Sequence, residues 1–106
     1  MEIITTDEFD AWIAKLRDRQ GRLRILHGIR KCEAHNTMVG DLKPVGEGVT
    51  EMRFHFGPGY RVYYTTHQEL TVLLLIGGDK STQEKDIEKA KRLAREFWKQ
   101  MEEESK

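Results

Sequence analysis

The chain has no long apolar run, a single cysteine and no net charge over its 106 residues. Its longest apolar stretch, Leu70 to Ile76, is far shorter than the roughly 20 residues that span a bilayer as a helix. Cys32 cannot form an internal disulfide, which fits a reducing cytoplasm, and its helical spacing favours a buried role. The four histidines show no chelating spacing. We therefore expect a cytoplasmic protein with no membrane contact, no metal and no cofactor.

The balance of 18 basic and 18 acidic residues points to no particular partner, but the charges are unevenly distributed. Seven basic residues and one acid, Asp18, lie between Lys15 and Lys31, whereas residues 102–104 are all glutamate. Local patches, more than totals, attract a polyanion. The basic segment is compatible with contact to RNA and equally with a solvated helix face.

One stretch, residues 50–81, predicts most of a sheet. Met52 to Phe56 alternates apolar and basic residues with the period of two that is typical of a strand with one buried face. Gly57-Pro58-Gly59 favours a turn, because glycine accepts positive φ and proline has no amide hydrogen to donate. Tyr60 to Thr66 then supplies a return strand, and Leu70 to Ile76 is apolar enough for a central strand covered on both faces.

Helical spacing of apolar residues predicts three helices around this sheet. The first follows a cap at Thr5 or Thr6, the second runs from Leu23 to about Ala34, and the third follows the capping box Ser81-x-x-Glu84. Residues 2–5 form a candidate strand beside the central one, and residues 36–47 favour a loop.

The expected architecture is a single α+β domain over residues 1–106, in the order β-α-α-β-β-β-α. We expect a small antiparallel-rich sheet with its helices packed on one face and the other face open to a ligand.

Polar side chains gather on that expected open face. Arg53 and His55 alternate with the apolar residues of one strand, Arg61 and Tyr63 lie on the next, and Lys80 follows the last strand. Guanidinium groups bind phosphate oxygens bidentately, so this cluster suits a phosphodiester. The alternative is that these are ordinary solvated residues on the exposed face of a small sheet.

Several motifs carry a resemblance to a known family. They are Glu51-Met52-Arg53, Gly57-Pro58-Gly59-Tyr60-Arg61-Val62-Tyr63-Tyr64, Gly77-Gly78-Asp79-Lys80-Ser81-Thr82-Gln83 with Asp86-Ile87 and Ala90, and the upstream Leu42-Lys43-Pro44-Val45-Gly46. With these motifs the chain resembles the RelE/ParE superfamily of type II toxins, and more narrowly its HigB-like addiction module killer protein branch. The resemblance implies the RelE-like microbial RNase fold and cleavage of mRNA on the ribosome. It also implies a helix-turn-helix antitoxin as partner, with operator DNA reached only through that antitoxin.

The resemblance assigns roles residue by residue. Arg61 matches the arginine that such nucleases use at the scissile phosphate, and Lys80 corresponds to the basic residue after the last strand. Arg53 and His55 stand on the strand that supplies lysines or a histidine in active members. Many active members have a tyrosine near the start of the final helix, where this chain has Asp86-Ile87. That departure leaves the general acid or base open.

RNA cleavage without a metal requires a base for the 2′-OH proton, a donor for the leaving 5′-oxygen and cations over the transition state. His55 is the candidate base, because an ordinary histidine titrates at about pH 6.5. The candidate catalytic cations are Arg53, Arg61 and Lys80. The candidate RNA-binding residues are Lys43, Asp86 and Tyr63, the last of which could orient or stack on a base.

Three functions are open at this point. The first is a ribosome-dependent mRNA endoribonuclease toxin, which the basic cluster on the sheet favours. A second is a ParE-like toxin that inhibits DNA gyrase and lacks the nuclease residues. The third is a catalytically decayed toxin homologue that serves mainly to bind its antitoxin.

Overall fold

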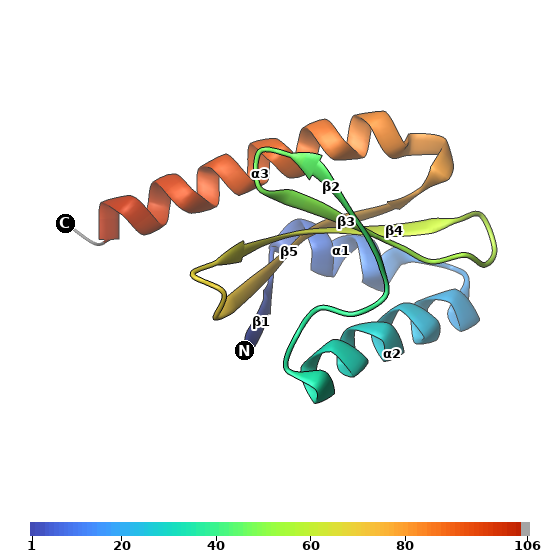
Figure 1. Ribbon diagram of the computed structural model, residues 1–106. Coiled ribbons are helices and arrows are strands. Elements are labelled where there is room, and N and C mark those ends of the chain that lie inside the picture. Colours follow the sequence, from blue (N-terminus) through green and yellow to red (C-terminus); the bar gives the residue numbers. More distant parts are fainter. Residues whose placement is uncertain (105–106) are drawn as a thin grey trace.

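The computed structural model describes residues 1–104 and shows five strands in one mixed sheet with three α-helices around it (Figure 1). The last two residues of the predicted domain, 105 and 106, lie outside the described residues. The strands lie in the order β1-β5-β4-β3-β2, with β1 parallel to β5 and the other pairs antiparallel. Along the chain the elements are β1 (Glu2–Thr5), α1 (Asp7–Lys15), α2 (Arg19–His35), β2 (Asp41–Gly46), β3 (Val49–Arg53), β4 (Tyr60–His67), β5 (Thr71–Asp79), the 3-10 helix η1 (Lys80–Thr82) and α3 (Gln83–Glu104).

Side-chain caps set where the first two helices begin. Thr6 caps α1 by accepting a hydrogen bond from the Phe9 amide at 2.9 Å, which confirms one of the two predicted caps. Asp18 caps α2 through the Gly21 amide at 3.0 Å, so this helix begins earlier than the predicted Leu23. Within residues 1–104, none of the helices combines the length and the apolar character needed to cross a membrane.

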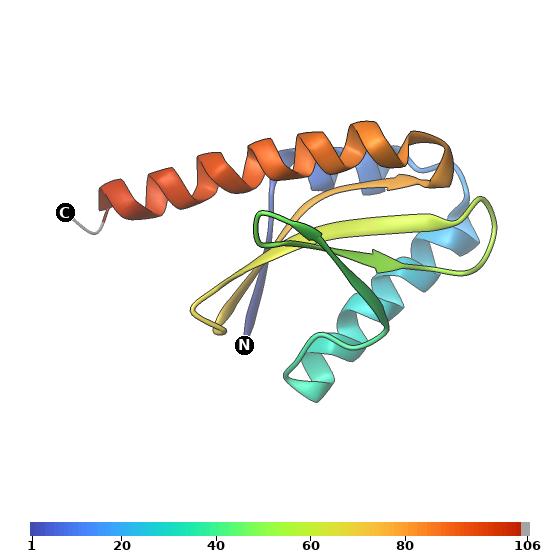
Figure 2. The same cartoon turned by 45° about the horizontal axis from the view of Figure 1, so that its top comes forward.

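Helices cover both faces of the sheet, so the prediction that they pack on one face was wrong. Figure 2, turned from the first view, shows α3 along one side of the strands and α2 along the other. Each helix contributes to its own apolar core: α2 supplies Ile25, Ile29 and Cys32 to one, and α3 supplies Ala90, Leu93 and Ala94 to the other. The prediction failed because most of β4 is buried on both of its faces, not on one. α3 therefore occupies the face that we expected to be open.

The predicted loop over residues 36–47 contains an additional strand, β2. Its residues Asp41 and Leu42 pair with Arg53 and Met52 of β3. Pro44 argued against a strand, but proline is tolerated on the edge of a sheet, and β2 is an edge strand. The observed strand and helix order is thus β-α-α-β-β-β-β-α, an α+β architecture that is consistent with a RelE-like fold.

Other predictions of the sheet are confirmed. β1 lies beside β5, and residues 72–76 of β5 are buried on both faces. The hairpin of β3 and β4 is present, although β3 ends at Arg53. Because the strand ends there, Phe54, His55 and Phe56 lie beyond it and lead into the turn.

Candidate functional site

The register of the strands places four positions in one row across the sheet. Asp41 of β2 faces Arg53 of β3, Arg53 faces Arg61 of β4, and Arg61 faces Gly78 of β5. Directly opposed residues of antiparallel strands project from the same face. Tyr63, two residues after Arg61, packs in the core under α3. The two arginines therefore share one face, as their alternation predicted, and it is the face that α3 covers.

A fully buried side chain, Glu51, lies between the two arginines. Its Oε2 accepts hydrogen bonds from Tyr63 Oη at 3.1 Å and from Gln83 Nε2 at 2.9 Å. Arg61 Nε lies 3.4 Å from the same oxygen, and Arg53 Nε lies 3.9 Å from Oε1. Oε1 is buried without a hydrogen bond from any of residues 1–104. Burying a carboxyl group is unfavourable unless it is paired and hydrogen-bonded, and here two hydrogen bonds to Oε2 and two nearby guanidinium groups offset part of that cost. The same contacts fix the two guanidinium groups in position.

Asp41 links Arg53 to His55 at the outer end of the row. Its Oδ1 accepts a hydrogen bond from Arg53 Nη2 at 3.3 Å, and its Oδ2 is hydrogen-bonded to His55 Nε2. Arg53 Nε lies 3.2 Å from Oδ2 and forms an ion pair with it, not a hydrogen bond. The bond from His55, followed by the bond from Arg53, lowers the pKa of Asp41 below its ordinary value. Asp41 is therefore ionised at neutral pH and acts only as an acceptor, so His55 Nε2 carries the hydrogen. In the neutral ring this leaves His55 Nδ1 free to accept a proton.

The exposed fraction of the basic side chains decreases from His55 through Arg53 to Arg61. The side chain of His55 is 70% exposed, that of Arg53 is 31% exposed, and that of Arg61 is 11% exposed. A ligand at this surface can thus reach the side chain of His55 directly, whereas most of the Arg61 side chain is covered.

The two predicted lysines lie at opposite borders of this row. Lys80 begins η1 and is exposed, and its Cβ lies beside Gly59, whose carbonyl oxygen accepts a 2.9 Å bond from Arg61 Nη1. Lys43 is also exposed, but it belongs to β2 and not to a loop, where it pairs in register with Glu51. Lys80 therefore joins the Arg61 end of the site, and contact of Lys43 with RNA stays a prediction.

Asp86 lies over Gly78, the last position of the row, which pairs with Arg61. A Cβ atom at position 78 would collide with the Asp86 carboxyl group, so only glycine permits this close approach. Burial raises the pKa of Asp86, a hydrogen bond from Thr82 at 2.5 Å opposes the change, and the charge of Asp79 adds to it. Contact of Asp86 with RNA stays a prediction, and the raised pKa extends the pH range over which it would donate a hydrogen bond.

Tyr63 needs a correction, because its burial does not fit the predicted stacking role. The residue has no exposed surface, and its hydroxyl group is bonded to Glu51. Burial, together with the negative charge of Glu51, raises the pKa of Tyr63 well above its ordinary value. A ring without an exposed face cannot stack on a base, so Tyr63 supports Glu51 instead.

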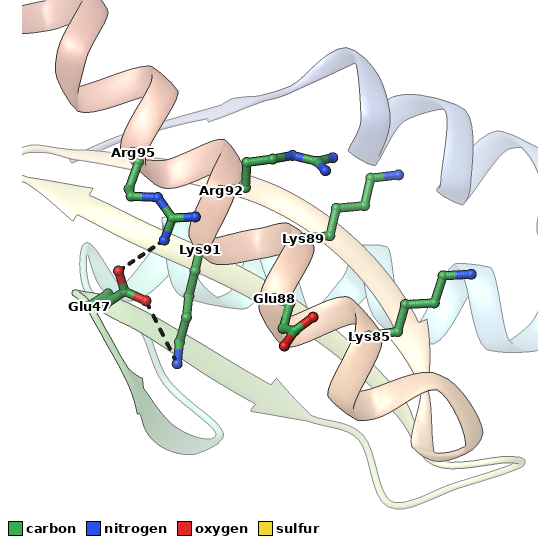
Figure 3. Close-up of a pocket in the computed structure, with 7 residues that line it drawn as sticks. All are labelled: Glu47, Lys85, Glu88, Lys89, Lys91, Arg92 and Arg95. Atoms are coloured by element: carbon green, nitrogen blue, oxygen red, sulfur yellow. Dashed lines mark hydrogen bonds and ion pairs between the residues drawn. The ribbon is translucent and has the colours of Figure 1, made fainter.

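A second charged region lies along α3 (Figure 3). It is a shallow hollow of about 720 Å³. Its lining residues are Glu47, Lys85, Glu88, Lys89, Lys91, Arg92 and Arg95. Glu47, in the turn between β2 and β3, pairs with Arg95 at 2.9 Å and with Lys91 at 4.0 Å. Two of its five cations therefore share one acidic partner, Glu47, and none of the predicted site residues lines the hollow.

Comparison with known proteins identifies the family. The family described as phage derived protein Gp49-like matches residues 7–99, which is most of the chain. The chain belongs to the Gp49-like family. This is a toxin-like family of addiction modules, and it is associated with toxin endoribonucleases. An uncharacterized protein of Haemophilus influenzae is 44% identical over 97 residues, which cover 92% of this chain and 96% of the relative.

Three residues of this Gp49-like site were missed in the sequence. Glu51 lies two positions before Arg53, so strand alternation alone places both on one face, and that signal could have revealed it. Asp41 was hidden by the prediction of a loop. Gln83 reaches Glu51 across 32 positions of sequence, a contact that no local pattern indicates.

Proposed function

We propose that this Gp49-like protein is the toxin of a type II toxin–antitoxin system and that it cleaves mRNA on the ribosome without a metal. One observation carries the proposal: the exposed imidazole of His55, oriented by Asp41, lies at the end of a row that contains two arginines. The membership in a toxin-like family of addiction modules agrees with it. As a toxin, the protein would be held inactive by an antitoxin, for which a helix-turn-helix protein is the expected partner.

In the proposed reaction, the 2′-oxygen of one nucleotide attacks the adjacent phosphorus and the bond from phosphorus to the 5′-oxygen breaks. His55 Nδ1 takes the 2′-OH proton while Nε2 keeps its hydrogen bond to Asp41. The ionised Asp41 stabilises the imidazolium that forms, which is the usual contribution of a carboxylate behind a catalytic histidine. The exposed Lys80 is the candidate donor for the leaving 5′-oxygen.

The two arginines are positioned to stabilise the negative charge that develops on the phosphate. Arg61 Nη1 donates a hydrogen bond to the Gly59 carbonyl and Arg53 Nη2 donates one to Asp41. The two Nε atoms lie beside carboxylates of Glu51 and Asp41 as ion pairs without hydrogen bonds. The remaining nitrogens of each guanidinium group can face a phosphate. Donors that are fixed before the substrate arrives need no reorganisation at the moment of reaction, which is the basis of electrostatic catalysis.

A specific observation favours one competing function, the decayed homologue that only binds an antitoxin. Both arginines are already paired with carboxyl groups, so the net positive charge facing an RNA is smaller than the sequence predicted. An arginine that is already paired with a carboxyl group gains less free energy from binding a phosphate.

The deciding experiment induces the wild-type protein, His55→Asn and Lys80→Gln in separate cultures and maps transcript ends by primer extension. We expect wild type to stop growth and to cut transcripts at codon positions, and both variants to cut far less. Both substituted residues are exposed, so equal thermal unfolding curves are expected and serve as the control. Growth arrest with intact transcripts would contradict the proposal, and inhibition of supercoiling by purified gyrase would then identify the ParE-like alternative. Normal growth with a stable antitoxin complex would identify the decayed homologue.

A further inference from the structure

The exposed side of α2 carries basic side chains that form no ion pair with an acidic residue of the described part of the chain. Arg24, His27 and Lys31 follow one another at spacings of three and four residues, so they form one stripe along the helix. All three are exposed. No carboxylate of residues 1–104 forms an ion pair with any of them, and the pKa of Asp18 is lowered by its bonds from the Gly21 amide and Tyr60 Oη and, to a smaller extent, by the charge of Arg24. Basic side chains without an ion-pair partner on one helix stripe are available for an external anion.

The stripe runs beside the chain segment that holds His55. Phe54 and Phe56 flank His55 in sequence, and both rings pack against α2. The ring of Phe54 lies against Gly28, where an added Cβ would come within 2.9 Å of it, and Arg24 Cζ lies 4.8 Å from the centre of the Phe56 ring. Because side chains alternate along an extended segment, His55 projects to the opposite side. His55 and the stripe on α2 therefore lie on opposite sides of the segment formed by residues 54–56.

The edge of this segment is not covered by β2. Pairing between β2 and β3 stops at Asp41 and Arg53, so residues 54–56 extend beyond the neighbouring strand. A flexible polyanion can therefore pass from His55 around this edge and reach Arg24 within a few nucleotides.

We propose that the stripe formed by Arg24, His27 and Lys31 binds the phosphate backbone of the substrate RNA next to the bond that is cleaved. The inference rests on the proposed nuclease function and adds to it a second contact region on the opposite face of the sheet. Its placement beside His55 favours the substrate strand over ribosomal RNA, which has no need to lie near the cleaved bond. Such contacts are independent of base sequence and are weakened by salt.

The α3 surface provides a matched comparison within the same molecule. Arg95 is paired with Glu47, and Lys99 lies one helical turn further along, on the far side of the sheet from α2. The double variant Arg95→Gln/Lys99→Gln removes the same charge as Arg24→Gln/Lys31→Gln. It leaves the stripe intact.

The test measures fluorescence anisotropy with single-stranded RNA carrying 2′-O-methyl groups, which cannot be cleaved. We use a short oligonucleotide of about 4 nucleotides and a long one of about 12. In the stripe variant we expect affinity for the long RNA to fall on the order of 10-fold and the salt slope to decrease by about 1.4, since each phosphate contact contributes about 0.7 for single strands. Affinity for the short RNA, and both affinities in the α3 variant, should be unchanged. Lys31→Gln alone changes an exposed residue away from the core, so it preserves the test if Arg24→Gln impairs folding.

Each other outcome overturns the inference. Equal losses in both double variants would show a general effect of charge, and equal affinities of all proteins for long RNA would show a solvated helix face. If the stripe variant loses affinity for purified ribosomes but not for long RNA, the stripe contacts the ribosome instead of the substrate strand. Failure of the nuclease proposal is recognised separately, because wild type would then leave transcripts intact whatever the oligonucleotides show.

Discussion

The two faces of the sheet bury different kinds of side chain. Beneath α2, the buried residues are apolar or aromatic, and the hydroxyl group of Tyr60 is hydrogen-bonded to Asp18 near the surface. Beneath the start of α3, the sheet buries the carboxyl group of Glu51 and surrounds it with polar partners. An apolar core stabilises the fold through the area it removes from water, whereas a buried carboxyl group adds little net stability. Both faces therefore have an apolar core that stabilises the fold, and the α3 face adds a buried polar cluster that positions chemical groups.

The largest effect is expected at His55, which belongs to the α3 face but is exposed. Replacing it by Asn should lower the rate of RNA cleavage by about 10²- to 10⁴-fold, the usual contribution of a positioned acid or base. The free energy of unfolding should change by no more than about 0.5 kcal/mol, because the side chain is mostly in water. Single-turnover cleavage and urea unfolding measure the two quantities. A large loss of stability would show that His55 belongs to the structural part of the molecule.

On the α2 face we expect a substitution to lower stability and to leave cleavage by the folded protein unchanged. Ile25→Ala removes a fully buried side chain and should lower the free energy of unfolding by about 3 kcal/mol. Leu23→Ala, on the same helix but 56% exposed, is the control and should cost less than about 0.5 kcal/mol. Cleavage per folded molecule should be unchanged in both. A cleavage defect that exceeds the loss of folded protein in Ile25→Ala would refute the division between the faces.

A pair of tyrosines compares the two faces with the same chemical change. Tyr63→Phe leaves the buried Glu51 without one hydrogen bond and should cost about 1–3 kcal/mol of unfolding free energy. Tyr60→Phe should cost less, because water replaces the lost bond to Asp18, which is exposed. Urea unfolding of both variants gives the ranking. Equal costs would mean that water reaches Glu51 as easily as Asp18.

The smallest effect concerns pH. The pKa of Asp41 is lowered by its bonds to His55 and Arg53, so its ionised form is favoured in the folded state. The resulting stability is fully present above the ordinary pKa of 3.8 and is lost as the pH falls below it toward the lowered value. Asp41→Asn should therefore lose less stability than wild type as the pH falls below the ordinary pKa of 3.8. Identical acid profiles would show that Asp41 is not paired in solution.

Much of the sheet could be predicted from local patterns, because strand alternation and turn residues act over a few positions. The hairpin at Gly57-Pro58-Gly59 and the pairing of residues 2–5 with the apolar strand are examples. Two features could not be predicted for a physical reason. Pro44 concealed an edge strand, and the covering of a second face depends on where α3 docks, which its own periodicity does not specify.

The candidate site was predictable only in part. Alternation correctly placed Arg53 and Arg61 on one face, because it depends on backbone geometry alone. What surrounds them depends on distant segments: Asp41 comes from β2 and Gln83 from α3. The site is therefore less cationic than its basic residues suggested, and its acidic residues orient the basic ones.

The chemistry of the cut ends distinguishes the proposed site from every alternative. The purified protein and ribosomes programmed with an mRNA would be incubated in the presence of a chelator, and the ends of the fragments would be analysed. With wild type we predict 2′,3′-cyclic phosphate and 5′-hydroxyl ends, because the 2′-oxygen is the nucleophile, and with His55→Asn we predict almost none. Fragments that end in 3′-hydroxyl and 5′-phosphate groups, or equal cutting by wild type and His55→Asn, would contradict the role that we give to this face of the sheet.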